Sequence, residues 1–80
     1  MKQHDPLPVF GQRLRARRYK KYMTMAELSR QSGIGAPEIR ALENDPQRGT
    51  NIRVLRALAV VLDCSTDWLL GLSEKMERST

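Results

Sequence analysis

Apolar residues recur every three or four positions along much of the chain, which is the spacing of one face of an α-helix. Phe10 and Leu14 begin the pattern, and Ile52, Leu55 and Leu58 continue it later in the chain. No segment shows the alternation of apolar and polar residues that is typical of a half-buried strand. The pattern predicts helices at about residues 9–21, 24–32, 36–43, 52–62 and 66–70.

Residues with strong preferences for helix ends mark the limits of these segments. Thr24 followed by Glu27 is a capping box, in which each residue satisfies a backbone N–H of the other. Gly33 and Gly71 are placed to end helices in the left-handed conformation. Pro37 lies in a predicted first turn, where its missing N–H costs nothing.

The second and third predicted helices are separated by only a short turn. Leu28, Gly33, Ile34, Ile39 and Leu42 have the spacing of a helix-turn-helix. Leu28 is expected to face Ile39 across the turn, and Gly33 allows the reversal without a Cβ clash. This two-helix unit is the most specific pattern in the sequence.

Composition limits the function classes. At 80 residues the chain supports one domain, and it is too short for a barrel or doubly wound enzyme. Cys64 has no partner for a disulfide and His4 has no second ligand near it, so no metal or other cofactor is expected. No catalytic constellation is visible, so an enzyme is not expected. No apolar run reaches the ~18 residues of a membrane span, and no secretory signal is recognised, so a cytoplasmic protein is expected.

The charge balance favours an anionic partner. With 14 basic and 9 acidic residues, the chain carries a formal charge of +5. Six of the basic residues fall within 9–21, either as a solvated face or as a footprint for phosphates. For Arg13, Arg15 and Arg17 the solvated face is the favoured interpretation.

Three segments together resemble a known family: FGQRLRARR, TMAELSRQSGIGAPEIRALEN and LRALAVVLDCSTDWLLG. They are similar, in order and spacing, to the Xre-type helix-turn-helix domains of phage repressors and Cro proteins. The resemblance implies an all-α fold, a compact five-helix repressor-like bundle. It also implies that helix 36–43 enters the major groove of double-stranded DNA while the preceding helix crosses the backbone.

The resemblance also implies roles for individual residues. Arg18 matches an arginine that pairs with a glutamate closing the recognition helix, here Glu43, as a structural brace that also helps to hold Asn44. The residues expected at the DNA are Thr24, Met25, Gly35, Ala36, Pro37, Glu38, Arg40, Ala41, Asn44 and Arg48. Asn44 and Arg48 are expected to contact phosphate, and Arg40 and Glu38 are the long polar side chains available to bases.

This chain departs from the family pattern at several of these positions. Met25 offers only its backbone N–H to a phosphate, and Ala36, Pro37 and Ala41 replace polar residues that reach base edges in relatives. Asp45 brings a negative charge close to the expected phosphate. Direct base readout is therefore expected to be thin, with DNA shape contributing more of the specificity.

Apolar residues beyond the needs of one core suggest self-association. The dimer candidates are Val61, Trp68, Leu70 and Leu72, and a weak homodimer would bind two half-sites at once. The alternative for Trp68 is that it closes the core of the monomer.

The expected organisation is a flexible lead-in at 1–8, a DNA-binding domain at 9–72 and a polar tail at 73–80. The favoured function is a sequence-specific DNA-binding transcriptional regulator that acts as a repressor. Two alternatives stay open. One is an antitoxin-type autoregulator that binds a toxin protein. The other is a protein-interaction module that has lost DNA binding.

Overall fold

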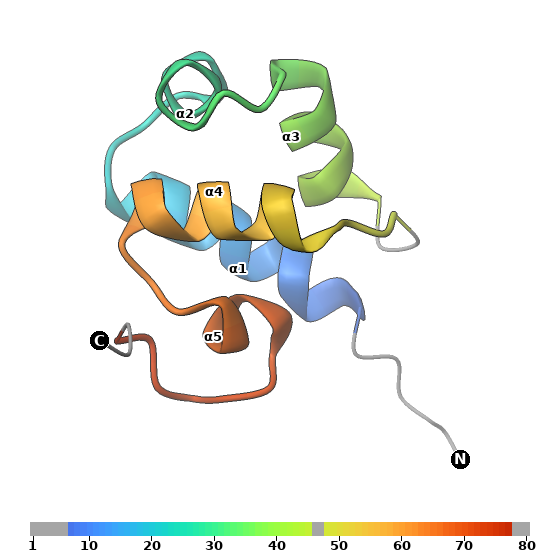
Figure 1. Cartoon of the computed structure of the whole chain (residues 1–80), viewed down its shortest axis with the longest axis vertical. Coiled ribbons are helices and arrows are strands. Elements are labelled where there is room, and N and C mark those ends of the chain that lie inside the picture. The colour runs from blue at the N-terminus through green and yellow to red at the C-terminus, as the bar shows by residue number, and fades with distance from the viewer. Residues whose placement is uncertain (1–6, 46–47, 78–80) are drawn as a thin grey trace.

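A computed structural model describes residues 7–45 and 48–77 of the chain. These residues form helices and no strands, which confirms the predicted all-α, five-helix bundle. The helices are α1 (Leu7–Lys20), α2 (Met25–Ser32), α3 (Ala36–Asn44), α4 (Ile52–Leu62) and α5 (Thr66–Leu70). In Figure 1, α2 and α3 lie together at one end and α5 lies at the other, with α1 and α4 between them.

Four helix limits differ from the prediction by one or two residues; α1 ends at Lys20 and α2 begins at Met25. Helix α1 begins at Leu7, two residues earlier than expected, because a proline at position 8 falls in the first turn, where no backbone N–H is needed. Helix α3 continues through Asn44, and the N–H of Asp45 still donates to the carbonyl of Ala41 at 2.9 Å. Of the expected lead-in, residues 1–6, including His4, lie outside the described residues.

The predicted caps are present. The hydroxyl of Thr24 accepts from the N–H of Glu27, and the Glu27 carboxylate accepts from the N–H of Thr24, both at 3.0 Å. Gly33 and Gly71 end α2 and α5 with φ of 79° and 82°. Tyr22 also takes a left-handed φ of 57° just after α1, a conformation that favours glycine.

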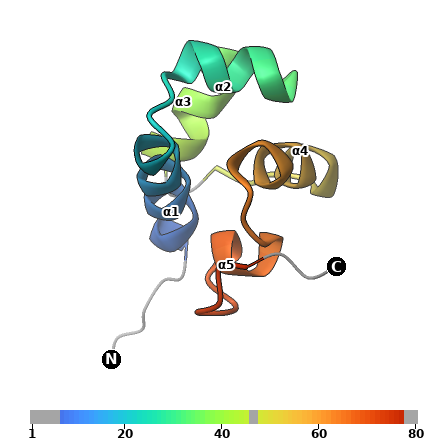
Figure 2. The ribbon, with the colours of Figure 1, turned by 90° about the vertical axis from the view of Figure 1, so that its left-hand side faces the viewer.

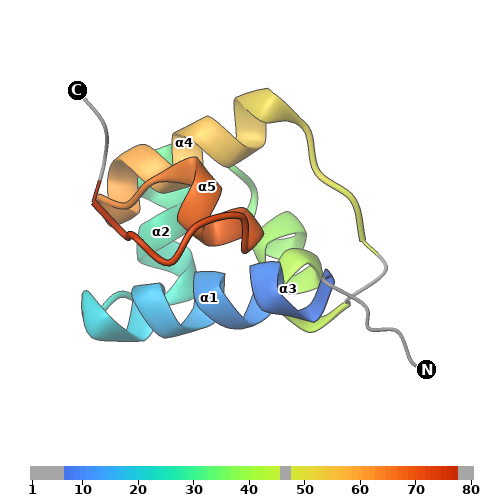
Figure 3. The same ribbon diagram turned by 90° about the horizontal axis from the view of Figure 1, so that it is seen from below.

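One apolar core joins all the helices. Its fully buried members are Leu14, Leu28, Ile39, Leu42, Leu58, Leu62, Cys64 and Leu69. Leu28 and Ile39 belong to this core from either side of the turn, and Cys64 is buried in it. The side view in Figure 2 shows α2 and α3 above α1 and α4, and the view from below in Figure 3 shows α5 lying between α1 and α4.

Helix α1 approaches α3 closely at Gly11. A Cβ at this position would lie 2.8 Å from the carbonyl oxygen of Leu42 and 2.9 Å from that of Glu43. Both distances are too short for a real Cβ, so only glycine lets α1 reach the end of α3. This contact brings the basic residues of α1 next to the predicted recognition helix.

Residues 73–77 lie against the domain. The N–H of Ser65 donates to the carbonyl of Met76 at 2.8 Å, and the half-buried Met76 side chain packs on the core. The rest of the expected polar tail, residues 78–80, lies outside the described residues. Within the described ranges, no helix is long and apolar enough to cross a membrane, and no group of three metal-ligating side chains is found.

Candidate nucleic-acid interface

Helix α3 has one buried face and one exposed face. Ile39 and Leu42 are 0% and 2% exposed and anchor the helix in the core. Pro37, Arg40 and Asn44 are exposed at helical spacing on the other side. Ala36 and Ala41 are half-buried beside them. Arg40 is the one long basic side chain on this outward face of α3.

The first turns of α2 and α3 differ in how they are capped. Thr24 uses its hydroxyl in the capping box, and the Met25 side chain packs on the core, so Met25 has only its backbone to offer a ligand. Gly35 begins α3 with no side-chain cap. Helix starts carry a partial positive charge and free N–H groups, so both turns are suited to an anionic backbone.

Glu38 and Arg48 form an ion pair with each other. A guanidinium nitrogen of Arg48, in the loop before α4, donates to a carboxylate oxygen of Glu38 on α3. Both side chains are partly exposed, at 31% for Glu38 and 44% for Arg48. Glu38 was expected to contact a base and Arg48 a phosphate, but the structure pairs the two side chains with each other.

Arg18 and Glu43 form a buried bidentate brace. Nε and Nη2 of Arg18 donate to the two Glu43 oxygens at 2.7 and 3.0 Å, and a third bond from Nη1 reaches the Met23 carbonyl at 2.9 Å. The hydrogen bond with Glu43 raises the pKa of Arg18, although burial opposes the rise. The guanidinium therefore stays charged and ties the end of α3 to α1.

Asn44 is held by Arg15, whereas the sequence suggested Arg18. Nη2 of Arg15 donates to Oδ1 of Asn44, and its Nε donates to Oε1 of Glu43 at 3.3 Å. The expectation that Arg15 belongs to a solvated face is wrong. Arg15 and Arg18 are three positions apart on α1, so both guanidinium groups reach the same end of α3.

Arg13 is also bound within the domain instead of being solvated. Its Nη1 donates to the Trp68 carbonyl at 2.7 Å and to the Ser73 carbonyl at 3.0 Å. Its guanidinium lies 4.9 Å from the centre of the Trp68 ring, and its Nη2 pairs with the exposed Glu74. Arg13 thus fixes α5 and the segment after it to α1.

Arg17 binds main-chain carbonyls at the end of α4. Its Nε donates to the Leu62 carbonyl at 2.8 Å, and its Nη2 donates to the Asp63 carbonyl at 3.1 Å. A cation at these carbonyls complements the helix dipole. A sequence signal existed, because positions 13 and 17 flank the apolar positions 10 and 14 on the helix and so lie at the edge of the buried face.

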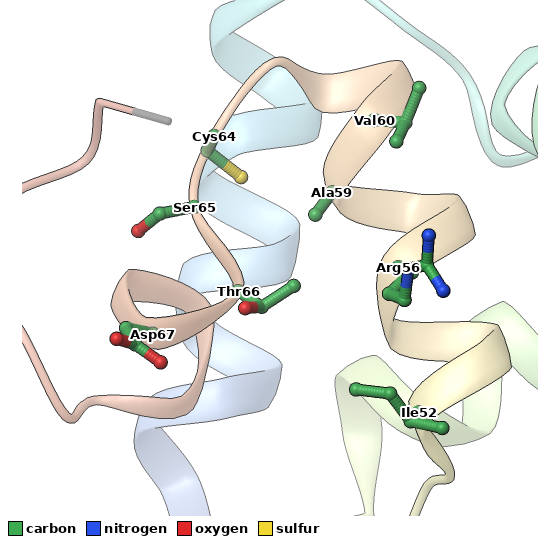
Figure 4. A pocket seen from close by; sticks show the side chains of 8 residues that line it. All are labelled: Ile52, Arg56, Ala59, Val60, Cys64, Ser65, Thr66 and Asp67. Carbon is green, nitrogen blue, oxygen red and sulfur yellow. The ribbon is translucent and has the colours of Figure 1, made fainter. Parts of the chain in front are cut away.

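The dimer candidates divide into two groups. Val61, Trp68 and Leu70 are half-buried and pack on the core of the monomer, whereas Leu72 is 74% exposed. Ile52 and Val60 on α4 are also exposed, at 65% and 56%. Figure 4 shows them along α4 with Arg56 between them, beside a groove of about 340 Å³ whose far wall is formed by residues 64–67.

Comparisons with known proteins agree with this geometry. The sequence pattern of the helix-turn-helix family matches residues 14–69. A chain from the solved complex of the SinR protein with the SinI protein is 30% identical, with a TM-score of 0.72. The match covers 76% of the present chain and 59% of the SinR/SinI chain, so the present chain corresponds to only part of that protein. A search of curated proteins found no match.

Proposed function

This chain belongs to the Cro/C1-type, Xre-like helix-turn-helix family, and on that premise we propose that it binds double-stranded DNA as a transcriptional repressor. The observation that carries the proposal is the exposed face of α3. It presents Arg40 and Asn44 outward while Ile39, Leu42 and the Arg18–Glu43 brace fix the helix from behind. A reading helix needs this combination of exposure and rigid support.

In the proposed complex α3 lies in the major groove. Arg40 donates to a guanine edge, and Ala36 and Ala41 touch thymine methyl groups. The first turns of α2 and α3 receive backbone phosphates at their N–H groups. Glu38 is held by Arg48, so base readout is thin and sequence-dependent DNA shape contributes to specificity.

The test is fluorescence anisotropy with a mixed-sequence duplex over a range of salt concentration. Several phosphate contacts predict a steep fall in affinity with rising salt. Duplexes selected from a random pool then allow the Arg40→Ala variant to be tested. This variant should lose about 1–3 kcal/mol of binding free energy and show relaxed preference at one base pair. A folded protein that fails to bind at low salt would overturn the proposal.

We propose in addition a weak homodimer. It would let two domains, each with few direct base contacts, bind adjacent half-sites. The ridge formed by Ile52, Arg56 and Val60 is flanked by grooves on both sides, which suits ridges-into-grooves packing with a second copy. Asp67 lines one of these grooves, so a two-fold axis can set it opposite the partner's Arg56. Sedimentation velocity over a concentration series should show a dimer that Val60→Asp abolishes. A monomer at all concentrations would refute it.

A second candidate function is binding to another protein, such as a toxin. It is favoured by the similarity to the SinR/SinI complex, in which two different proteins associate. DNA binding that is absent, or insensitive to salt, would favour this role over the first. Co-purification with the product of a neighbouring gene would identify the partner.

A further inference from the structure

Two arginines of α1 converge on a single carboxylate at the end of α3. Arg18 binds both oxygens of Glu43, at 2.7 and 3.0 Å, and its side chain is only 7% exposed. Arg15 binds the same carboxylate through one longer bond of 3.3 Å, and its side chain is 41% exposed. The Glu43 side chain itself is fully buried. Two positive charges and one negative charge leave a net charge of +1, and it lies on the more exposed partner, Arg15.

The orientation of the Asn44 amide follows from its contact with Arg15. A guanidinium has only donors, so the Asn44 atom that it meets must be the carbonyl oxygen Oδ1. The amide NH₂ group of Asn44 is then available to an acceptor outside the contact. Arg15 uses Nε for Glu43 and Nη2 for Asn44, and a guanidinium has five N–H groups, so it has more donors than these two contacts use.

The result is an exposed pair of donors that carries the positive charge of Arg15. Neither available group is an acceptor, so the pair is suited to an oxyanion with several oxygens and unsuited to a cation or a neutral donor. The pair sits at the end of α3, beside the face that carries Arg40. The following residue, Asp45, would repel an anion, and the charge on Arg15 offsets that repulsion.

We propose that Arg15 and Asn44 form a phosphate-binding pair that receives one backbone phosphate of DNA beside the end of α3. Asn44 was already expected at phosphate, and the new assignment is Arg15. The inference rests on the proposed DNA binding and specifies a contact within it. Arg18 alone is enough to neutralise the charge of Glu43. The positive charge of Arg15 therefore remains available to a phosphate.

The first test compares the salt dependence of DNA binding for the wild type, Arg15→Ala and Arg15→Gln. Loss of one phosphate contact should reduce the slope of log K against log salt by about 0.9. Over a fourfold rise in salt, the variants should therefore lose about 3.5-fold less affinity than the wild type. Lys75→Ala removes the same charge from the exposed segment after α5 and should leave the slope unchanged. Arg15→Lys keeps the charge and should keep most of the slope.

A purely structural role gives a different result. If Arg15 only positions Asn44, Arg15→Ala weakens binding, Arg15→Gln largely keeps it, and the slope stays at the wild-type value in both, which overturns the proposal. Thermal melting by circular dichroism checks that each variant is folded. If Arg15→Ala does not fold, Arg15→Gln takes its place, because the glutamine amide can still donate to Asn44.

A second test does not use DNA. Inorganic phosphate is titrated into the ¹⁵N-labelled protein, and the side-chain signals of Arg15 Nε and Asn44 Nδ2 are followed. Both signals should shift together and saturate, and the Asn44 shift should vanish in Arg15→Gln. Shifts without DNA binding would retain the anion site and reject the proposed function. DNA binding with an unchanged slope in the variants and no phosphate shifts would retain the function and reject the site.

Discussion

The arginines of α1 face two regions of the molecule, and they are used differently in each. Toward α4 and α5, Arg13 and Arg17 donate to main-chain carbonyls, so their positive charges complete helix ends and cover Trp68. Toward α3, Arg15 and Arg18 meet side chains, and one carboxylate serves both. The first region uses its cations as structural donors, whereas the second leaves one positive charge at the surface next to the reading helix.

This difference shows that a cluster of basic residues is not by itself a binding surface. Six basic residues occupy one short segment of the sequence, yet their roles depend on what each side chain meets in the fold. The α5 side should therefore matter for stability with no effect on DNA binding. The α3 side should matter for both.

Breaking the buried Arg18–Glu43 brace should have the largest effect on stability. Glu43→Ala leaves the guanidinium of Arg18 buried without its carboxylate, and this should cost about 3–5 kcal/mol of unfolding free energy. Urea denaturation followed by circular dichroism measures the loss. The double variant Arg18→Met with Glu43→Leu removes both charges and should recover most of it. If Glu43→Ala were as stable as the wild type, the brace would have no structural role.

Separating α1 from α3 should have the next largest effect. Gly11→Ala places a Cβ against the carbonyl oxygens of Leu42 and Glu43, and the overpacking should cost about 1–3 kcal/mol. Its matched control is Gly49→Ala, where nothing lies within 4 Å of the added Cβ. Equal thermal stability of the two variants would contradict the close approach of α1 to α3.

On the α5 side, Arg13→Ala should lower stability by about 1–2 kcal/mol. It removes hydrogen bonds to two carbonyls and the cation–π contact with Trp68, whereas the pair with the exposed Glu74 contributes little. The salt dependence of DNA binding should keep its wild-type slope in this variant. A reduced slope would mean that the cation contacts phosphate, and the contrast between the two regions would fail.

The smallest expected effect is at the Glu38–Arg48 ion pair. Glu38→Gln removes the negative charge from α3 and releases Arg48, so affinity for DNA should rise by less than about 1 kcal/mol. The gain should be largest at low salt, and anisotropy at two salt concentrations measures it. Weaker binding confined to duplexes that carry one particular base would instead assign Glu38 a direct contact with that base.

The sequence predicted the helices well because their signals are local. The Thr24–Glu27 capping box, the two left-handed glycines and the apolar spacing from Leu28 to Leu42 each depend on residues close together in the chain. Family resemblance supplied the pairing of Arg18 with Glu43, which local pattern alone does not indicate. The start of α1 was predicted two residues too late, because apolar spacing alone does not show that the proline at position 8 lies in the first turn.

The sequence failed where a side chain finds a distant partner. Nothing near Arg13 or Arg17 indicates that their acceptors are carbonyls some 45 to 60 positions away. The need for glycine at position 11 depends on the path of α3 and not on a turn. Sequence spacing also left open whether Trp68 faces a second copy or closes the core, because the arginine that lies over its ring comes from a distant part of the chain.

The most direct test of the two-region account is a ¹⁵N–¹H correlation spectrum recorded as a DNA duplex is added. The account predicts shifts at the backbone amides of Arg40 and Asn44 and at the side chain of Arg15. The side-chain signal of Arg13 is expected to stay unchanged. Shifts confined to α4 and α5, with α3 unchanged, would contradict the account.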